Sequence, residues 1–256
     1  MKTTPTFLHQ NKPLITCQVQ AATPDDLIRL IRGASFDGCD AYGFQMEAMN
    51  PEYRNVEALR PAFEAAGRKP IYLTNYRGHA ANEGKTDEQL AEEYLEFRAM
   101  GATLIDVLGD LYCPSQYEIT YDQEAIEKQK KLIDRLHAAG AEVLMSSHTF
   151  TFMSAEEVLA IAKEHQSRGA DISKIVSAAN TEEEELENLK TTALLRRELD
   201  IPFLFLSTGT HTKLHRTVGP MLGSCMWLTV HEYDQLATLA QPACHAIRAI
   251  ADHFEY

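Results

Sequence analysis

The stretch GADISKIVSAANTEEEE, residues 169–185, contains one complete unit of a pattern that runs through the chain. An apolar run from Ala170 to Val176 follows the glycine, and after a loop of small residues the acidic segment Thr181–Glu185 begins a helix. A glycine suits the end of the preceding helix, and glutamates suit the positive end of the next helix dipole. The stretch therefore predicts a strand followed by a helix, with Lys174 inside the strand.

Glycine, strand and helix recur about every 30 residues, which is the size of a βα unit. Helix starts are marked by Thr23-Pro24-Asp25-Asp26 and by capping-box sequences at Thr86 and Ser154. Eight such units without a low-complexity linker predict one (β/α)8 TIM barrel domain over residues 1–256, with an open doubly wound sheet as the alternative. The predicted strands are Leu14–Gln20, Asp40–Gln45, Pro70–Asn75, Thr103–Leu108, Glu142–Ser147, Asp171–Val176, Pro202–Ser207 and Ser224–Val230.

Composition excludes several classes of protein. The chain has 24 lysines and arginines against 37 aspartates and glutamates, a net charge of -13, which argues against a partner with a phosphate backbone. No segment approaches the roughly 18 apolar residues of a membrane span, and the first residues lack the apolar core of a signal peptide. The five cysteines form no CxxC pair, which suits reduced thiols. We expect a cytoplasmic protein with no metal, cofactor, nucleic-acid or membrane partner.

In a TIM barrel, function lies at the carboxyl ends of the strands. The fifth predicted strand is followed by His148, and Lys174 lies on the sixth, so the amine and the imidazole could come within hydrogen-bond reach. A poorly solvated lysine has a lowered pKa, and its neutral amine can form a Schiff base with a ketone while a histidine moves the protons. The alternatives are a lysine that reaches out to solvent and a structural histidine.

Two other strand ends carry polar residues. After the seventh strand, Arg216 could hold a carboxylate by a two-pronged contact, while His211 and His215 could share a helix face and ligate a metal. A polar surface helix is the alternative for this segment. After the third strand, Arg77 and Glu83 enter a loop, and Glu83 could orient His148 as carboxylates orient imidazole bases. A plain surface loop fits that segment equally well.

With these residues the sequence resembles the type I 3-dehydroquinate dehydratases, from Leu14 to the C-terminal helix. The resemblance is strongest in VLMSSHTF, GADISKIV and HRTVGPMLGS. It implies a (β/α)8 barrel in which Lys174 forms the Schiff base and His148 is the general acid and base. It also implies that Arg216 holds the substrate carboxylate, that Arg77 lies beside the substrate, and that Glu83 is the carboxylate partner of the histidine.

The sequence departs from the family pattern around the substrate. Gly43-Phe44-Gln45 stands where the family has Glu-x-Arg, and Cys244 stands where it has the lid glutamine. His215 replaces the serine before the arginine, and Thr149 replaces the aspartate after the catalytic histidine. We expect Gln45, His215 and Cys244 to line an altered substrate site. A site that has lost hydrogen-bond partners for a polyhydroxylated substrate discriminates strongly against it. The sequence therefore specifies the chemistry better than the substrate.

The leading hypothesis is a Schiff-base lyase that takes a small anionic ketone and dehydrates 3-dehydroquinate to 3-dehydroshikimate. A divergent paralogue could apply the same chemistry to a related keto-acid or keto-sugar. Two further hypotheses are a metal-dependent barrel isomerase or hydrolase built on His148, His211 and His215 with Asp106, and a ligand-binding barrel without turnover. The sequence leaves the oligomeric state open, with a homodimer as one option.

Overall fold

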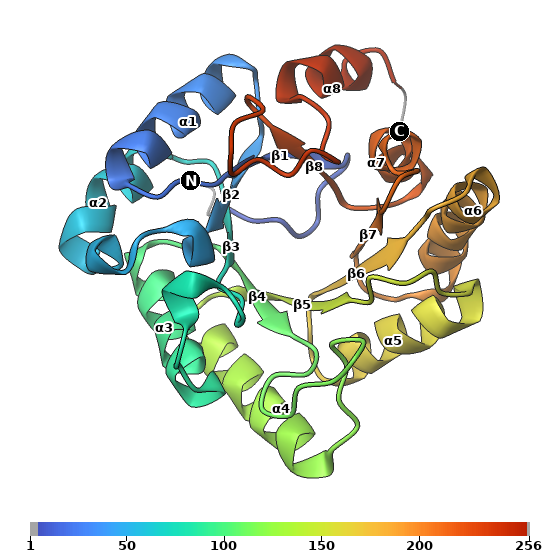
Figure 1. Ribbon diagram of the computed structural model, residues 1–256, viewed down its shortest axis with the longest axis horizontal. Coiled ribbons are helices and arrows are strands. Elements are labelled where there is room, and N and C mark those ends of the chain that lie inside the picture. Colours follow the sequence, from blue (N-terminus) through green and yellow to red (C-terminus); the bar gives the residue numbers. More distant parts are fainter. Residues whose placement is uncertain (1–4, 255–256) are drawn as a thin grey trace.

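The centre of the molecule is a barrel of parallel strands. The computed structural model describes residues 5–254, and the strands in this part of the chain are ordered β7-β6-β5-β4-β3-β2-β1-β8 (Figure 1). Each differs from its prediction by at most two residues at either end, which confirms the (β/α)8 fold. The strands are β1 (Leu14–Val19), β2 (Ala41–Gln45), β3 (Ile71–Thr74), β4 (Leu104–Leu108), β5 (Glu142–His148), β6 (Ile172–Ala178), β7 (Phe203–Thr208) and β8 (Met226–Val230).

The barrel is almost closed between β7 and β8, which form the two ends of the paired sheet. The backbone N–H of Cys225 donates to the carbonyl of Phe203 at 2.8 Å, and the N–H of Phe205 donates to Ser224 Oγ at 3.2 Å. These contacts lie at the amino-terminal ends of both strands. β7 and β8 are therefore joined at the end of the barrel opposite the expected catalytic face.

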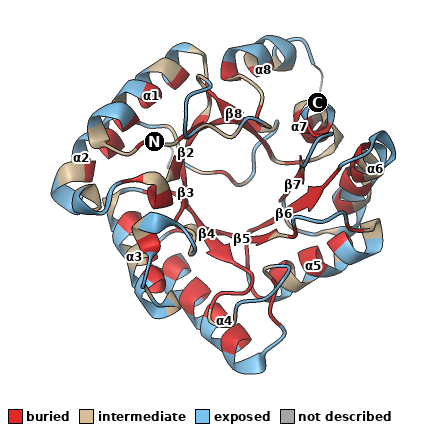
Figure 2. Ribbon diagram, viewed as in Figure 1, coloured by how far each residue is buried: buried red, intermediate tan, exposed pale blue. Residues whose placement is uncertain are grey.

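The helices cover the outside of the barrel, and Figure 2 shows buried strands inside a ring of helices whose outer faces are exposed. The predicted capping boxes at Thr86 and Ser154 are both formed, and Thr23 caps a helix that begins with Pro24. The helices are α1 (Pro24–Phe36), α2 (Val56–Ala65), α3 (Asp87–Met100), α4 (Gln123–Ala138), α5 (Ala155–Ser167), α6 (Glu182–Glu198), α7 (Lys213–Leu222) and α8 (Cys244–Ala251), with short 3-10 turns η1 (Met46–Ala48), η2 (Pro51–Tyr53) and η3 (Ala80–Asn82). Among the described residues, no helix combines the length and the apolar character needed to cross a membrane.

Strand alternation decides which side chains enter the barrel. Successive residues of a strand point to opposite faces, so every second residue lies inside. Tyr72, Leu104, Leu144 and Ile172 belong to one interior cluster, whereas Cys17 and Trp227 pack between strands and helices in another. The same alternation places Asp106, Ser146 and Lys174 inside the barrel, one layer nearer the carboxyl ends of the strands.

Candidate active site

Lys174 lies inside the barrel and is only 4% exposed, yet its charge is fully partnered. Its Nζ atom donates to the hydroxyls of Tyr72 at 2.9 Å and Tyr76 at 2.5 Å. The third contact is an ion pair with Asp106 Oδ2 at 3.1 Å. An ammonium group has three donors, and each has an oxygen acceptor here. The buried lysine is therefore held within the barrel and does not reach out to solvent.

Asp106, on β4, joins the other members of this cluster. Its carboxylate accepts hydrogen bonds from both phenols, including Tyr76 at 2.5 Å, and from Ser146 Oγ at 2.5 Å. Burial alone would raise the pKa of Asp106, but the charge of Lys174 and these hydrogen bonds hold it below its ordinary value. The resting site thus contains a carboxylate and an ammonium, bridged by two phenols.

The phenols of Tyr72 and Tyr76 are neutral donors. Burial, followed by the negative charge of Asp106, raises the pKa of each phenol well above its ordinary value. Tyr72 is wholly buried, whereas Tyr76 follows the end of β3 and is only partly buried. The two tyrosines therefore contact the same ion pair from different depths.

His148 ends β5 and forms the second part of the site. Its Nδ1 lies 2.6 Å from Glu118 Oε2, and the same oxygen accepts the backbone N–H of His148 at 3.1 Å. A carboxylate at Nδ1 favours a proton on that nitrogen, which leaves Nε2 free to exchange protons. His148 and Tyr76 pack edge to face, with their ring centroids 5.2 Å apart. The imidazole therefore lies next to the lysine cluster.

Glu118 is held in an uncommon backbone conformation on the loop after β4. Its φ of 49° lies in the left-handed region, which costs a non-glycine residue on the order of 1 kcal/mol. Ser147 Oγ donates to the Glu118 carbonyl at 2.7 Å and also lies 3.0 Å from Nε2 of the buried His165. The neighbouring side chains of β5 and α5 thereby support the carboxylate that orients His148.

Comparisons with known proteins identify the family of this chain. The sequence model of the type I 3-dehydroquinase family matches residues 15–254. The chain belongs to the type I 3-dehydroquinase family. This is a family of dehydratases, which are lyases. A curated 3-dehydroquinate dehydratase from Klebsiella pneumoniae is 24% identical over 247 residues, which cover 95% of this chain and 94% of the relative.

Solved structures of type I 3-dehydroquinases share the fold. The 3-dehydroquinate dehydratase from Enterococcus faecalis aligns with a TM-score of 0.76 at 20% identity, covering 99% of this chain and 100% of that one. The type I enzyme from Clostridium difficile, solved with covalently modified comenic acid, aligns with a TM-score of 0.78 at 16% identity over 95% of this chain and 92% of that one. At these identities the likeness establishes a shared barrel.

The structure places two residues predicted for the site, Glu83 and Arg77, on the loop after β3. Glu83 lies exposed at the end of η3, and the carboxylate that contacts His148 belongs to Glu118. Arg77, next to Tyr76 on the loop after β3, pairs with Asp110 at 3.0 Å and with Asp87 at 3.3 Å. The prediction of Glu83 as the partner of His148 was therefore wrong, and Arg77 is engaged in joining loops.

Arg216 and His215 are adjacent on α7 but face different surroundings. Arg216 is buried, and its Nε donates to the carbonyl of Ser207 at 2.7 Å. Burial lowers the pKa of Arg216 to about 10, so it stays charged at neutral pH. Within residues 5–254 its guanidinium makes this one hydrogen bond to protein. Its terminal amino groups are therefore free to bind a carboxylate.

His215 is a structural residue. Its Nε2 lies 2.9 Å from the hydroxyl of Thr192 on α6, and its Nδ1 accepts the N–H of Ser207 at 3.3 Å. Burial lowers the pKa of His215 to about 3, so the ring is neutral. The ring packs between α6 and β7 outside the barrel, and the prediction that it contacts substrate was wrong.

Cys244 also lies outside the barrel. It begins α8 and belongs to the cluster between strands and helices, together with the outward-facing Cys17 and Ile247. A side chain in this cluster cannot replace a lid residue over the substrate, so the prediction of Cys244 as a substrate contact was wrong. All five cysteines lie in the described part of the chain and are free thiols.

Gln45 and two residues that the sequence analysis missed line the inner wall near β1 and β2. Gln45 is partly buried on the inner face of β2, level with Thr74. Gln18, on β1, lies opposite Gly43, where an added Cβ would come within 2.6 Å of Gln18 Oε1. That oxygen is buried without a hydrogen-bond partner among the described residues. A polar residue inside an apolar strand, paired with a glycine, was the available signal.

Glu47 is another residue that the sequence analysis did not single out. It follows β2 on η1, is 6% exposed, and its carboxyl accepts the hydroxyl of Thr74 at 2.9 Å. Burial raises the pKa of Glu47 to about 7, and the nearby charge of Asp106 adds to this effect. A carboxyl that titrates near neutral pH beside the lysine cluster is typical of functional sites.

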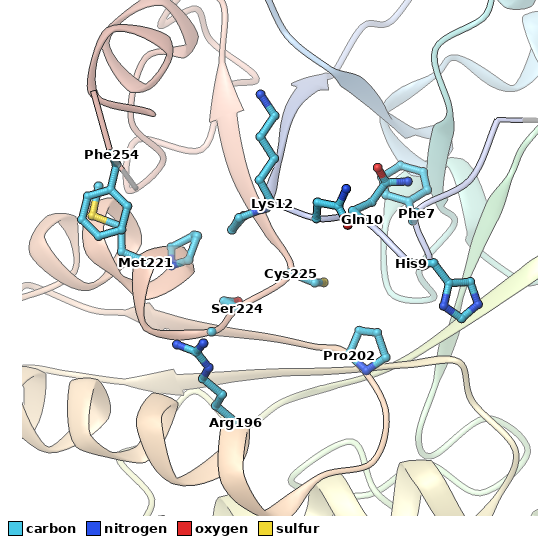
Figure 3. Close-up of a pocket in the computed structure, with 14 residues that line it drawn as sticks. Phe7, His9, Gln10, Lys12, Arg196, Pro202, Met221, Ser224, Cys225 and Phe254 are labelled. Carbon is cyan, nitrogen blue, oxygen red and sulfur yellow. The ribbon is translucent and has the colours of Figure 1, made fainter. Parts of the chain in front are cut away.

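A large cavity of about 520 Å³ lies at the opposite end of the barrel (Figure 3). His9, Lys12, Arg196 and Cys225 are among the residues around it. It is bordered by segments that precede strands, whereas barrel enzymes act at the ends that follow strands. It is therefore separate from the site built on Lys174.

The three histidines of the metal hypothesis are not brought together. His148 faces Glu118, His215 is buried against α6, and His211 is exposed after β7. Across residues 5–254, no group of three or more histidine, cysteine, aspartate or glutamate side chains is arranged to hold a metal ion. The geometry gives the metal-dependent alternative no ligand set.

Proposed function

We propose that this protein dehydrates 3-dehydroquinate to 3-dehydroshikimate through an imine on Lys174. The observation that carries the proposal is a buried lysine amine, held by Asp106 and two phenols next to the His148–Glu118 pair. Membership of the type I 3-dehydroquinase family supports the reaction, since the curated relatives are 3-dehydroquinate dehydratases. The covalently modified ligand of the Clostridium difficile enzyme supports covalent chemistry.

In the proposed reaction, Arg216 binds the carboxylate of the substrate and the amine of Lys174 attacks the ketone. Loss of water gives an iminium that makes the neighbouring C–H acidic. His148 removes that proton through Nε2, and the resulting enamine expels the β-hydroxyl, which leaves as water with the proton that His148 carries. Water then hydrolyses the product imine and restores Lys174. Glu118 stabilises the imidazolium that forms between the two proton transfers.

A related hydroxylated keto-acid is the second candidate substrate. Gly43 and Gln45 occupy the inner wall where the family pattern has a glutamate and an arginine, and Gln18 lies opposite Gly43 on β1. The unpartnered Oε1 of Gln18 supports a substrate that presents a hydroxyl donor to β1. We propose a cytoplasmic location as well, which the five free thiols support.

The test is an assay of purified protein with 3-dehydroquinate, following the ultraviolet absorbance of the conjugated enone product. We expect turnover by the wild-type protein and a loss of at least about 10⁴-fold in Lys174→Met. A panel of hydroxylated keto-acids, assayed in parallel for loss of water, identifies a shifted substrate. Turnover of 3-dehydroquinate that survives in Lys174→Met would overturn the imine mechanism.

A further inference from the structure

The hydroxyl of Tyr76 lies between the amine of Lys174 and the carboxylate of Asp106. It accepts the Nζ–H of Lys174 at 2.5 Å and donates to Asp106 Oδ2 at 2.5 Å. It thus connects the amine that must lose protons to the carboxylate that can accept them. Tyr72 makes contacts with the same two groups, but it lies deeper in the barrel and is fully buried.

We propose that Tyr76 is the catalytic acid for imine formation, passing a proton from Asp106 to the hydroxyl that leaves the carbinolamine. The assignment rests on the proposed imine chemistry and divides the proton transfers between two residues. Tyr76 acts at the C–N bond, and His148 acts at the C–H bond and the β-hydroxyl. The packing of the two rings, with centroids 5.2 Å apart, puts both groups at one reacting centre.

The proton balance of this step closes without another reactant. The ammonium of Lys174 first gives one proton to Asp106, and the free amine forms a C–N bond to the ketone. A second proton moves from nitrogen to the former carbonyl oxygen, which gives a neutral carbinolamine. Tyr76 then protonates the hydroxyl, which departs as water while the nitrogen lone pair forms the C=N bond. Asp106 returns its proton to the phenolate, so that only the ammonium and the ketone have become an iminium and water.

Position distinguishes Tyr76 from Tyr72. Tyr76 follows the carboxyl end of β3 and is partly exposed on the side where substrate enters a barrel. Tyr72 lies among the interior residues Ala41 and Leu104, below the amine. The carbinolamine hydroxyl forms on the substrate side of Nζ, so Tyr76 is the phenol that can reach it. Burial raises the pKa of Tyr76, so its phenol is protonated in the resting site and can act as a proton donor.

The experiment compares Tyr76→Phe with the matched variant Tyr72→Phe. Each protein is mixed rapidly with 3-dehydroquinate and quenched with borohydride at increasing times, and the fraction of Lys174 adduct is measured by mass spectrometry. We expect Tyr76→Phe to form the imine about 10²-fold more slowly than the wild type. Tyr72→Phe should stay within about tenfold, because it loses only a supporting hydrogen bond. Solvent exchange of the α-proton in imine already formed should be unchanged in Tyr76→Phe.

Each outcome separates the two proposals. An adduct that forms at the wild-type rate in Tyr76→Phe, or equal slowing in both variants, overturns the role of Tyr76 and leaves the imine mechanism intact. An absence of adduct in the wild-type protein overturns both. If Tyr76→Phe does not fold, difluorotyrosine at position 76 keeps the ring shape and lowers the phenol pKa. A rate of imine formation that is insensitive to this change would then overturn the assignment.

Discussion

The two halves of the barrel interior differ in how their polar groups are partnered. Along β3 to β6, the phenols, Asp106, Ser146 and Lys174 form a network in which the ammonium has three acceptors and the carboxylate has four donors. Along β7, β8, β1 and β2, the inner wall carries Leu206, Leu228 and a glycine, and the Oε1 of Gln18 has no partner among the described residues.

This difference indicates that the two halves of the barrel interior have different functions. A network in which every donor has an acceptor keeps reacting groups in fixed positions, as the chemistry of an imine requires. An unpartnered buried acceptor is costly in the free protein and becomes useful when a ligand supplies the donor. The first half is therefore suited to reaction and the second to recognition. The departures from the family pattern at Gly43 and Gln45 lie in the recognition half.

Breaking the ion pair should produce the largest effect on stability. Asp106→Asn leaves the ammonium of Lys174 buried without a counter-charge, and we expect the free energy of unfolding to fall by about 3–5 kcal/mol. Adding Lys174→Met to the same protein should restore a large part of this loss. Urea unfolding of the two single variants and the double variant gives the coupling energy. Additive effects would contradict a tightly coupled pair.

Glu47 should make stability fall as pH rises. Its pKa is about 7 in the folded protein and 4.5 ordinarily, so between these values the folded state holds a proton that the unfolded state has lost. We compare the free energy of unfolding of Glu47→Gln with that of the wild type. We expect this difference to be more favourable to the variant at pH 8 than at pH 4, by up to about 3 kcal/mol. Urea unfolding at both pH values measures it, with the exposed Glu52→Gln as control. The same difference at both pH values would contradict the raised pKa.

The orientation of His148 should depend on Glu118 and not on Glu83. We expect Glu118→Gln to lower kcat by about 10²-fold, because the imidazolium loses its carboxylate, with little change in KM. Glu83→Gln should stay within about twofold, since it lies exposed on a neighbouring loop. Steady-state kinetics of both variants give the kcat and KM values that test this prediction. A larger loss in Glu83→Gln would show that the loop after β3 closes over the histidine during turnover.

In the recognition half, Gln18→Leu should separate stability from activity. Removing an unpartnered buried oxygen should leave the free energy of unfolding unchanged or raise it by about 1 kcal/mol. If the oxygen accepts a substrate hydroxyl, kcat/KM should fall by about tenfold or more. Cys244→Ala is the matched control outside the barrel, and it should leave KM unchanged. An unaltered kcat/KM in Gln18→Leu would remove this residue from the substrate site.

The sequence predicted the features that follow from regular periodicity. Strand alternation and strand order place Lys174 and His148 on one rim, because both depend only on regular elements. Residues whose direction depends on helix phase or loop path were predicted less well. His215 and Arg216 are neighbours on α7, where a turn of about 100° per residue directs the imidazole to Thr192 on α6 and the guanidinium to the carbonyl of Ser207.

Loop residues were the least predictable. Glu118 reaches His148 through a left-handed backbone that only its neighbours stabilise, and nothing in the segment around it marks that conformation. Tyr72 resembles an ordinary strand residue and Tyr76 an ordinary loop residue, and only the structure shows that both phenols contact Lys174. Chemistry that spans several loops therefore requires the three-dimensional structure.

The most direct test of the imine on Lys174 is borohydride reduction of the wild-type protein during turnover of 3-dehydroquinate, followed by peptide mapping. We expect a reduced adduct on the peptide that contains Lys174, and none in Lys174→Met or without substrate. Turnover of 3-dehydroquinate with no adduct on Lys174, or with the adduct on another lysine, would contradict it.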